Sequence, residues 1–313
     1  MSLRALVKKS VTASSIYYLA DDWRAGRRRA SGSIETTSGS RHQSLSVAES
    51  TAYIRNVFTD YLAYGGVSQL TGRVAEIGPG DNFGLALLLL ANGADEVHAI
   101  DRFYSKRDPD IQGPIYRALA NEEGAEDLFD GEPGEDTMSG LSYHPGVAAE
   151  EFFSDRRASY DAILSRAVLE HLYDPIGALD DMVRALKPGG RLIHRIDFRD
   201  HGMFAGHHPL TFLTIGENWY RRMTRQSGRP NRVLLHRYQN WLDEKGLEGD
   251  IRITRLAGVK DEIKPANWPD ISSDLREAAL ASVKKIRPKL AAPFRTVADE
   301  DLAVAGIVLT VKA

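Results

Sequence analysis

The sequence has no cysteine and no long apolar run. Without cysteine the chain cannot form disulfides, thiolate metal sites or a cysteine nucleophile, so any catalysis has to use oxygen and nitrogen groups. No apolar stretch approaches the roughly 18 residues of a candidate membrane helix, and the first residues lack the continuous apolar region of a secretory signal. We therefore expect a cytoplasmic protein that makes no use of a membrane.

The net charge is also small, at −3 over 313 residues, which gives no overall attraction to nucleic acid. Basic side chains nevertheless gather in residues 1–30, and a stretch rich in Ser, Thr and Gly follows at 31–40. We therefore predict a basic, partly flexible N-terminal arm over 1–45 and a main domain over 46–313. The arm is a candidate contact for an anionic partner, or for a second copy of the chain in a homo-oligomer.

The segment Val74–Gly84 has the pattern of a buried strand, a glycine turn and a helix. Gly78 and Gly80 allow the backbone to turn with no side chain in the way, and the apolar run Leu85–Leu90 begins the helix. The next strand ends in Asp101, about 20 residues further on, where an acidic side chain can accept hydrogen bonds from ribose hydroxyls. This pairing predicts a site for an adenosine-containing cofactor.

Two residues indicate which kind of cofactor. A dinucleotide fingerprint has a third glycine three residues after the second, but this chain has Phe83 there, which disfavours a pyrophosphate. Glu76 lies two residues before Gly78, and its carboxylate would repel phosphate and attract an ammonium or sulfonium group. The pattern favours a nucleoside that carries an amino acid.

The arrangement of Glu76, Gly78 and Gly80, followed by Asp101, resembles the class I S-adenosylmethionine-dependent methyltransferases. Two later segments resemble the same family. One is similar to its fourth strand, followed by a helix carrying Val168, Leu169 and Leu172; the other is similar to its next helix, closed by Lys187–Gly190, and a fifth strand from Arg191. The resemblance covers roughly Gly72–Asp200 and the last strand.

The resemblance implies a Rossmann-like α/β fold. Its sheet would have seven mostly parallel strands with an antiparallel last strand and helices on both faces. We expect the third strand near 141–143 and the final two strands near 251–258 and 304–312. A helical N-terminal arm and insertions at about 201–232 and 258–301 complete the expectation, with both insertions on the acceptor side.

A helix is predicted immediately before the first strand. Ser46–Glu49 forms a capping box, and Gly65–Gly66 ends the apolar stripe that follows it. In the suspected family such a helix often lies over the cofactor, so His42, Tyr53 or Arg55 is a candidate contact for its methionine end. Packing in the core is the alternative role for this stripe.

The resemblance also implies the cofactor, S-adenosylmethionine, which would leave as S-adenosylhomocysteine. The residues it assigns to cofactor binding are Glu76, Gly78, Pro79, Gly80, Asp101, Arg102, Val147, Ala148, Ser165 and Arg166. The chain departs from the family in the loop 145–150. Many relatives place an acid there for the adenine amino group, whereas Val147 and Ala148 offer only backbone and apolar contact, and Glu150 stays an open candidate.

Methyl transfer is a direct displacement at carbon, so the protein has to hold the nucleophile, the methyl carbon and the sulfonium in line. A hydroxyl acceptor must also lose its proton, which directs attention to histidines near the strand ends. We place His201 first, close to Asp197 and Asp200, with His171 as a second candidate. The alternatives are a loop histidine satisfied by a neighbouring carboxylate for His201 and a structural role for His171.

No metal is expected in this site. Asp197, Asp200 and His201 could supply ligands to magnesium, but three close polar residues at a strand end are more often a hydrogen-bonded turn. The paired Asp and Asn of catechol-type relatives are missing.

The sequence is thus interpreted as a methyltransferase that acts on a small-molecule or saccharide acceptor, with oxygen as the expected methylated atom. A nucleic-acid methyltransferase is the first alternative, although Ser165–Ala167 stands where an NPPY-like tetrapeptide would flip a base. A non-catalytic protein that binds S-adenosylmethionine and an oxidoreductase with an unusual glycine turn are the others.

Overall fold

The computed structural model describes residues 10–36 and 39–313. Its main feature is a seven-stranded sheet in the order β5-β3-β2-β6-β7-β9-β8. Only β9 runs antiparallel to its neighbours β7 and β8, and the other neighbouring pairs are parallel. The strands are β2 (Gly72–Ile77), β3 (Ala94–Asp101), β5 (Leu141–Pro145), β6 (Tyr160–Arg166), β7 (Leu186–Asp197), β8 (Glu248–Leu256) and β9 (Val304–Lys312). The predicted fold class is confirmed.

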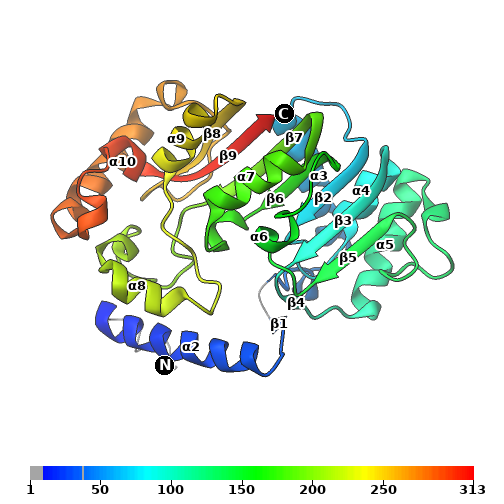
Figure 1. Ribbon diagram of the computed structural model, residues 1–313, viewed down its shortest axis with the longest axis horizontal. Helices are drawn as coiled ribbons and strands as arrows, with labels where there is room; N and C mark the ends of the chain where they lie inside the picture. The colour runs from blue at the N-terminus through cyan, green and yellow to red at the C-terminus, as the bar shows by residue number, and fades with distance from the viewer. Residues whose placement is uncertain (1–9, 37–38) are drawn as a thin grey trace.

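Helices cover both faces of this sheet, as Figure 1 shows. One face carries α3 (Val47–Gly65), α4 (Gly84–Ala91) and α5 (Pro109–Glu123), and the other carries α6 (Ala149–Phe152), α7 (Pro175–Ala185) and α9 (Leu235–Lys245). A parallel sheet buried on both faces requires nearly continuous apolar strands, and Val74 and Ala75 of β2 accordingly pack into two different cores. The carboxyl ends of the parallel strands therefore meet at one edge between the layers.

The helix before the first strand forms as predicted. The Ser46 hydroxyl accepts from the Glu49 backbone N–H at 3.3 Å, and the Ser46 backbone N–H donates to the Glu49 carboxylate at 2.9 Å. These reciprocal bonds satisfy backbone donors that a helix start leaves open. The helix ends at Gly65, and Gly66 adopts a left-handed conformation with φ of +61°.

Two predicted boundaries after the fourth strand were wrong. Val168–Leu172 does not form a helix but contains one short 3-10 turn, η3 (Leu169–His171), and α7 starts only at Pro175. The reason is local, because Pro175 occupies the first helical position and the preceding Asp174 caps the helix by accepting from the Gly177 N–H at 3.0 Å.

The next predicted boundary also differs. α7 ends at Ala185 and β7 begins directly at Leu186, so the predicted Lys187–Gly190 turn lies inside the strand. Leu186 pairs with Tyr160, and the register then shifts before Arg191 pairs with Ala162. The Pro and Gly residues thus form an irregular strand start.

The stretch 102–146, which shows no clear periodicity in the sequence, contains the helix α5. Asp108 caps it by accepting from the Asp110 N–H at 3.1 Å, Pro109 occupies its first turn, and Gly124 ends it with φ of +64°. The third strand, predicted near 141–143, extends to Pro145.

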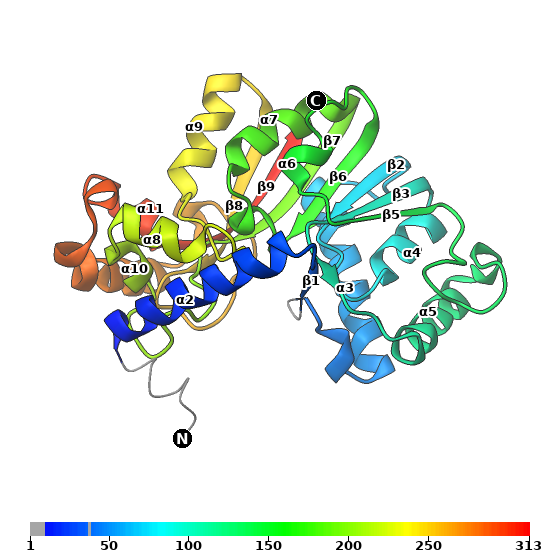
Figure 2. The ribbon, with the colours of Figure 1, turned by 60° about the horizontal axis from the view of Figure 1, so that its bottom comes forward.

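The N-terminal arm contains a long helix, α2 (Val11–Ala30), and a short strand, β1 (Glu35–Thr36). The helix lies along α8 (Glu217–Thr224) of the first insertion, as Figure 2 shows. The Asp22 carboxylate fixes this contact by accepting from the backbone N–H groups of Gln226 at 2.7 Å and Ser227 at 2.9 Å. At its other end β1 pairs in parallel with β4 (Tyr104–Ser105), so the arm is attached to two distant parts of the chain.

Both insertions contain helices. The first holds η4 (Thr211–Thr214) and α8, and the second holds η5 (Trp268–Asp270), α10 (Ser273–Ile286), η6 (Arg287–Lys289), η7 (Ala292–Phe294) and α11 (Asp299–Ala303). Among the described residues, no helix combines the length and the apolar character that crossing a bilayer demands.

Candidate active site

The glycine turn after β2 is tightly enclosed by the protein itself. Gly78 and Gly80 have φ values of +76° and +71°, and a Cβ on Gly78 would lie 2.5 Å from a methyl group of Val168. A Cβ on Gly80 would lie 2.9 Å from the carbonyl oxygen of Gly39. Both positions therefore require glycine for conformation and for packing.

Gly39 belongs to residues 39–45, which we call the covering segment because it crosses the glycine turn. The buried Asp81 carboxylate accepts from the backbone N–H groups of His42 at 3.4 Å and Gln43 at 3.2 Å. The Gln43 side-chain amide donates to the Lys106 carbonyl at 2.7 Å, and the Asp81 N–H donates to the Gly39 carbonyl at 3.1 Å. These bonds hold the N-terminal arm directly over the predicted cofactor site.

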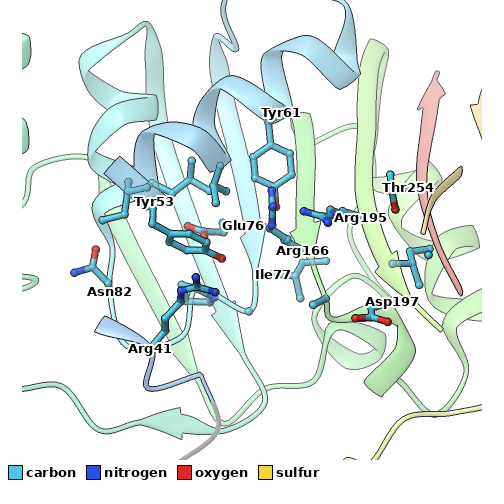
Figure 3. A pocket seen from close by; sticks show the side chains of 18 of the residues that line it. Arg41, Tyr53, Tyr61, Glu76, Ile77, Asn82, Arg166, Arg195, Asp197 and Thr254 are labelled. Carbon is cyan, nitrogen blue, oxygen red and sulfur yellow. The ribbon is translucent and has the colours of Figure 1, made fainter. Parts of the chain in front are cut away.

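A cavity of about 320 Å³ opens beside this turn, between α3 and the carboxyl ends of β2, β6 and β7. Figure 3 shows Arg41, Tyr53 and Asn82 at one end, Glu76 and Arg166 in the middle, and Asp197 and Thr254 at the other end. His42 and Tyr53, two of the three candidate contacts for a methionine group, line it. Arg55 does not, because its guanidinium pairs with Glu122 and Glu123.

Glu76 is the most unusual group in this cavity. Only 7% of the residue is exposed, and its Oε2 atom has no hydrogen-bond partner among the described residues. Burial raises the pKa of Glu76 to about 8, with the Arg107 charge acting in the opposite direction. A buried, unpartnered carboxyl group that faces a cavity is suited to a cationic ligand.

Asp101 lies at the carboxyl end of β3, where its Oδ1 atom accepts from the Phe103 N–H at 3.2 Å. Burial raises its pKa to about 6, while that hydrogen bond and the Arg107 charge oppose the shift. The Oδ2 atom of Asp101 accepts no hydrogen bond among the described residues, and Asp101 is not one of the residues that line the cavity.

Arg107, which the sequence analysis did not identify, links these groups. Its Nη2 donates to the Gly80 carbonyl at 2.8 Å, and its guanidinium lies over the rings of Phe83 and Tyr143 at 4.1 and 4.3 Å. It is buried beside the turn, and its charge reduces the rise that burial causes in the pKa of Glu76 and of Asp101. No motif marks it in the sequence, because it follows Asp101 in a stretch without periodicity.

The other predicted cofactor residues are spread around the same edge of the sheet. Arg102 lies over the Tyr173 ring at 3.9 Å, the Val147 N–H donates to the Asp101 carbonyl at 3.2 Å, and Ala148 precedes α6 as its N-cap. Glu150 accepts from the Tyr173 N–H at 2.9 Å. The loops after β3 and β5 are therefore brought together as the resemblance implied.

Ser165 and Arg166, at the end of β6, face different ways. The buried Ser165 hydroxyl bonds to His194 Nδ1 at 2.8 Å, so the side chain of Ser165 points into the core. Arg166 lines the cavity together with Pro79, and its Nη1 pairs with Asp60 at 2.7 Å.

The predicted catalytic residues meet at the carboxyl end of β7. Asp197 lines the cavity, and the Arg199 side chain donates to both of its oxygens at 2.8 and 2.5 Å. His201 follows in a left-handed conformation with φ of +48°, and its Nε2 lies 3.8 Å from Asp197 Oδ2. Asp200 instead accepts from two backbone N–H groups, those of Gly202 and Phe204, and so forms the hydrogen-bonded turn considered above.

His171 comes from η3 to join this group. Its ring stands edge-on to the His201 ring, with centroids 4.8 Å apart, and burial together with His201 lowers the pKa of His171 to about 4. Burial also lowers the pKa of His201, although the nearby Asp197 carboxylate raises it.

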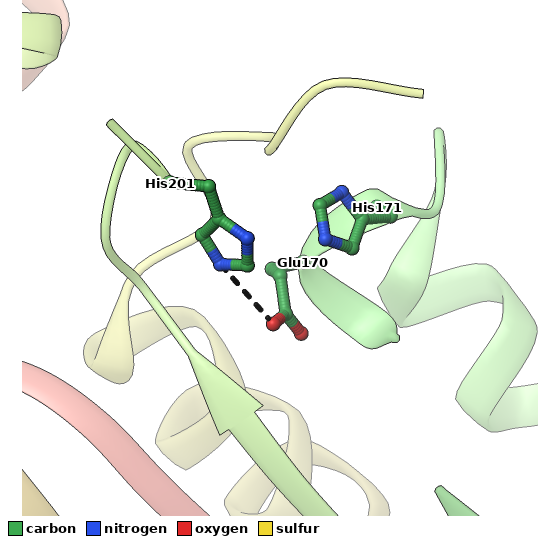
Figure 4. Close-up of side chains that lie close together, drawn as sticks. All are labelled: Glu170, His171 and His201. Carbon is green, nitrogen blue, oxygen red and sulfur yellow. Dashed lines mark ion pairs between the residues drawn. The ribbon is translucent and has the colours of Figure 1, made fainter. Parts of the chain in front are cut away.

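Between the two histidines lies Glu170, which the sequence analysis did not single out. Figure 4 shows its carboxylate below both rings, and Oε1 lies 3.6 Å from His201 Nε2. The residue is 1% exposed, and both oxygens lack a hydrogen-bond partner among the described residues. Burial raises its pKa well above the ordinary value. Its sequence neighbourhood resembles a helix, which hid this inward orientation.

A comparison with protein families identifies this arrangement. The profile of the methyltransferase domain family matches residues 47–250, more than half of the chain. The chain belongs to this family. The methyltransferase has the class I, Rossmann-like fold, and S-adenosylmethionine is its cofactor, as the glycine-turn resemblance implied.

Among curated proteins, none matches the chain significantly. Solved structures with a similar course include the [4+2]-cyclase SpnF, with 16% identity, a TM-score of 0.41, and coverage of 82% of this chain and 79% of that one. Phosphoethanolamine N-methyltransferase 2 of Haemonchus contortus has 15% identity, a TM-score of 0.42, and coverage of 82% and 52%. A methyltransferase of unassigned function from Bacillus halodurans has 14% identity, a TM-score of 0.41, and coverage of 82% and 98%.

The residues of this methyltransferase fit its cofactor. Glu76 lines the cavity, and its buried Oε2 atom has no hydrogen-bond partner among the described residues, so this atom can accept from a cationic group. Asp101 lies at the end of the adjacent strand, outside the lining of this cavity but in the same loop cluster as Arg102 and Val147. Glu76 could thus accept from the amino group of the cofactor, and Asp101 could accept from its ribose hydroxyls.

Proposed function

We propose that this methyltransferase transfers the methyl group of S-adenosylmethionine to a hydroxyl oxygen of a small-molecule or saccharide acceptor. The cavity of about 320 Å³ carries the proposal, because it extends from Glu76, next to the glycine turn, to Asp197 at its far end. This volume is at the lower end of the range for small-ligand pockets. A folded macromolecule would have to present a single extended group to enter it.

The chain's own residues would do two things at the cofactor end. Glu76 and the backbone of Gly78 and Pro79 would hold the amino-acid part, and Asp101 would accept from the ribose hydroxyls. The bound cofactor supplies an electrophilic methyl carbon on a positively charged sulfur. Fixing this carbon opposite the acceptor oxygen is worth several kcal/mol of the barrier, because it removes the entropy of bringing two reactants together.

At the acceptor end, the proton of the hydroxyl has to leave as its oxygen attacks. The oxygen–carbon bond forms while the carbon–sulfur bond breaks, and the sulfur keeps the electron pair. We assign the proton to the pair formed by Asp197 and His201, which lies 3.8 Å apart at the end of β7. Asp197 faces the cavity, and His201 is 29% exposed.

The lining at this end favours a polar acceptor. Arg195, Arg255 and Glu262 form one ion-paired group there, with Thr254 beside it. Such side chains can bond to several hydroxyl groups at once, as a saccharide would require.

The exposed arginines of α2, together with the exposed Ile16 and Trp23, make the arm our candidate contact for a second copy of the chain.

The test begins with calorimetry of the purified protein against S-adenosylhomocysteine and NAD. We expect binding of the first and none of the second; the reverse result would refute the cofactor assignment. Radiolabelled donor and pooled metabolite and glycan extracts then follow, with mass spectrometry to locate the methylated atom. Label on a hydroxyl oxygen of a small acceptor is expected. Label only on nitrogen or carbon, or only on RNA or DNA, would refute this acceptor class.

A further inference from the structure

The group Glu170, His171 and His201 has features that methyl transfer alone does not explain. A fully buried carboxyl group whose two oxygens have no hydrogen-bond partner among the described residues is expensive, because burial removes the water that these oxygens would otherwise bond to. Proteins usually offset this cost with a cation or with several donors. Two imidazole rings approach this carboxyl group from two sides, as Figure 4 shows, and the backbone N–H groups of Glu170 and Asp197 also act on it.

The distances match shared ligands rather than hydrogen bonds. His201 Nε2 and Glu170 Oε1 are 3.6 Å apart, which is too long for a hydrogen bond. It is close to the spacing of two ligand atoms that each lie about 2.0–2.2 Å from one metal ion. One ligand atom from each of the three residues lies within 4.8 Å of the others, so small movements would bring all three onto one ion.

The tautomer of His171 is also suitable. Its Nδ1 lies 2.8 Å from the Gly228 carbonyl, which can only accept, so Nδ1 carries the hydrogen. The Nε2 lone pair is then free to act as a ligand, and a carbonyl behind a histidine is a usual second layer around a metal.

The turn that carries Glu170 and His171 is held in place by a residue of the first insertion. The Asn231 side-chain amide donates to the carbonyls of Leu169 and Leu172 at 2.9 and 3.0 Å, and the Asn231 backbone N–H donates to the Glu170 carbonyl. These bonds fix the backbone of η3, so the two ligands are positioned before any ion arrives.

We propose that Glu170, His171 and His201 bind one divalent transition-metal ion beside the acceptor cavity. Two imidazoles and one carboxylate favour zinc, cobalt, manganese or iron over magnesium and calcium, which prefer oxygen ligands. This assignment departs from the metal-free site expected from the sequence, and it uses two residues outside the set of Asp197, Asp200 and His201. Three protein ligands would leave a fourth position on such an ion open, and the His201 side chain is 29% exposed.

For catalysis the inference rests on the proposed function. An acceptor oxygen bound at the open position would be held beside Asp197 and would lose its proton more readily, because a cation lowers the pKa of a bound hydroxyl. With His201 engaged as a ligand, Asp197 takes the proton. The metal site itself does not depend on which acceptor is methylated.

The test uses the full chain, stripped with a chelator and titrated with Co²⁺ and Zn²⁺ without cofactor or acceptor. We expect one equivalent to bind, with a visible Co²⁺ spectrum unlike that of the hydrated ion. Magnesium should not displace it. Glu170→Gln and His201→Asn should each weaken binding on the order of 100-fold or more, since even second-layer changes cost 10–100-fold. Asn is chosen because it tolerates the left-handed conformation of His201.

The control is His236→Asn on α9, outside this group, which should bind the ions as the parent does. Circular dichroism has to show that the variants are folded; Glu170→Gln keeps the size and shape of the side chain. Absence of a bound equivalent in the parent, or binding that both ligand variants retain, would overturn the inference. If the ion binds as expected but no hydroxyl acceptor is methylated, only the proposed function fails.

Discussion

At the scale of single residues, two acids define the cofactor site. Their positions follow from the strands that carry them, since β2 and β3 are neighbours and Glu76 pairs in register with Ala99. Asp101 is close enough to Glu76 for its charge to raise the pKa of Glu76 further. Asp101 can be tested through cofactor affinity, and Glu76 through the pH dependence of the free energy of unfolding.

The first prediction concerns Asp101. Replacing it with Ala removes acceptors for the ribose hydroxyls, and a hydrogen bond to a charged group is worth about 1.5–3 kcal/mol. We expect S-adenosylhomocysteine to bind about 10- to 100-fold more weakly, as measured by calorimetry. Asp95→Ala, an exposed acid on the same strand, is the matched control. Unchanged affinity in Asp101→Ala would exclude the ribose role.

The second prediction uses the pKa of Glu76. In the cofactor-free folded protein this carboxyl group keeps its proton up to a pH of about 8, whereas an unfolded glutamate releases it near 4.5. Between these values the unfolded chain binds fewer protons than the folded one, so rising pH lowers the free energy of unfolding. The full loss is several kcal/mol, at about 1.4 kcal/mol for each unit of difference in pKa.

Glu76→Gln should remove most of this dependence and should be more stable than the parent at pH 8 without cofactor. Urea unfolding from pH 5 to pH 8 measures both effects. Glu277→Gln, on the exposed face of α10, should leave the slope as it is. A parent protein whose stability does not fall over this interval would refute the pKa assignment.

At the scale of elements, the covering segment is the part that the fold class does not supply. It holds the arm across the glycine turn mainly through Asp81, which accepts two backbone N–H groups. In Asp81→Ala we expect this segment to detach, because the backbone N–H groups of His42 and Gln43 lose the carboxylate to which they donate. Trypsin should then cut faster after the exposed Arg41, and cofactor affinity should fall several-fold.

The digestion is followed by mass spectrometry, with and without S-adenosylhomocysteine. Asp110→Ala, an exposed acid in the first turn of α5, provides the comparison and should be cut at the rate of the parent. Equal rates at Arg41 in Asp81→Ala and the parent would mean that these two hydrogen bonds do not hold the segment.

The elements that could be predicted are those whose signals are local. Gly78 and Gly80, the capping box at Ser46 and the apolar run of α4 each specify a backbone conformation over a few residues. The class I family then supplied the sheet order. Leu169–His171 has the composition of a helix and was predicted as one, but it forms a 3-10 turn. Pro175, where the next helix starts, and the contact with Asn231 account for this difference.

The site residues that the sequence analysis missed share a different property. Arg107 and Glu170 are charged groups buried by tertiary contacts, and burial of a charge leaves no periodic signal in the sequence. Glu170 stands next to His171 in a motif that packs against the sheet in this fold. The contact of Glu170 with His201 and that of His171 with Gly228 join segments far apart in the sequence, and they show that the Glu170 carboxylate belongs to a site.

At the scale of the whole molecule, the N-terminal arm connects the two halves of the active site. Its helix α2 lies along α8 of the acceptor-side insertion, and β1 pairs with β4 beyond the cofactor-side strand β3. The covering segment between them and α3 crosses the glycine turn. Order in the insertion and order at the cofactor site should therefore depend on one another.

The last prediction tests this connection at Asp22, which is buried and accepts from the N–H groups of Gln226 and Ser227. Asp22→Ala leaves both donors without their acceptor, at a cost of about 1–3 kcal/mol each if they stay buried. We expect a lower midpoint of thermal unfolding and faster hydrogen exchange in α8. Because the arm also holds the glycine turn, cofactor affinity should fall although Asp22 lies outside that site. Arg24→Ala, an exposed change on the same helix, should cause none of these three changes. Faster exchange in α8 with unchanged cofactor affinity would show that the arm holds each half separately.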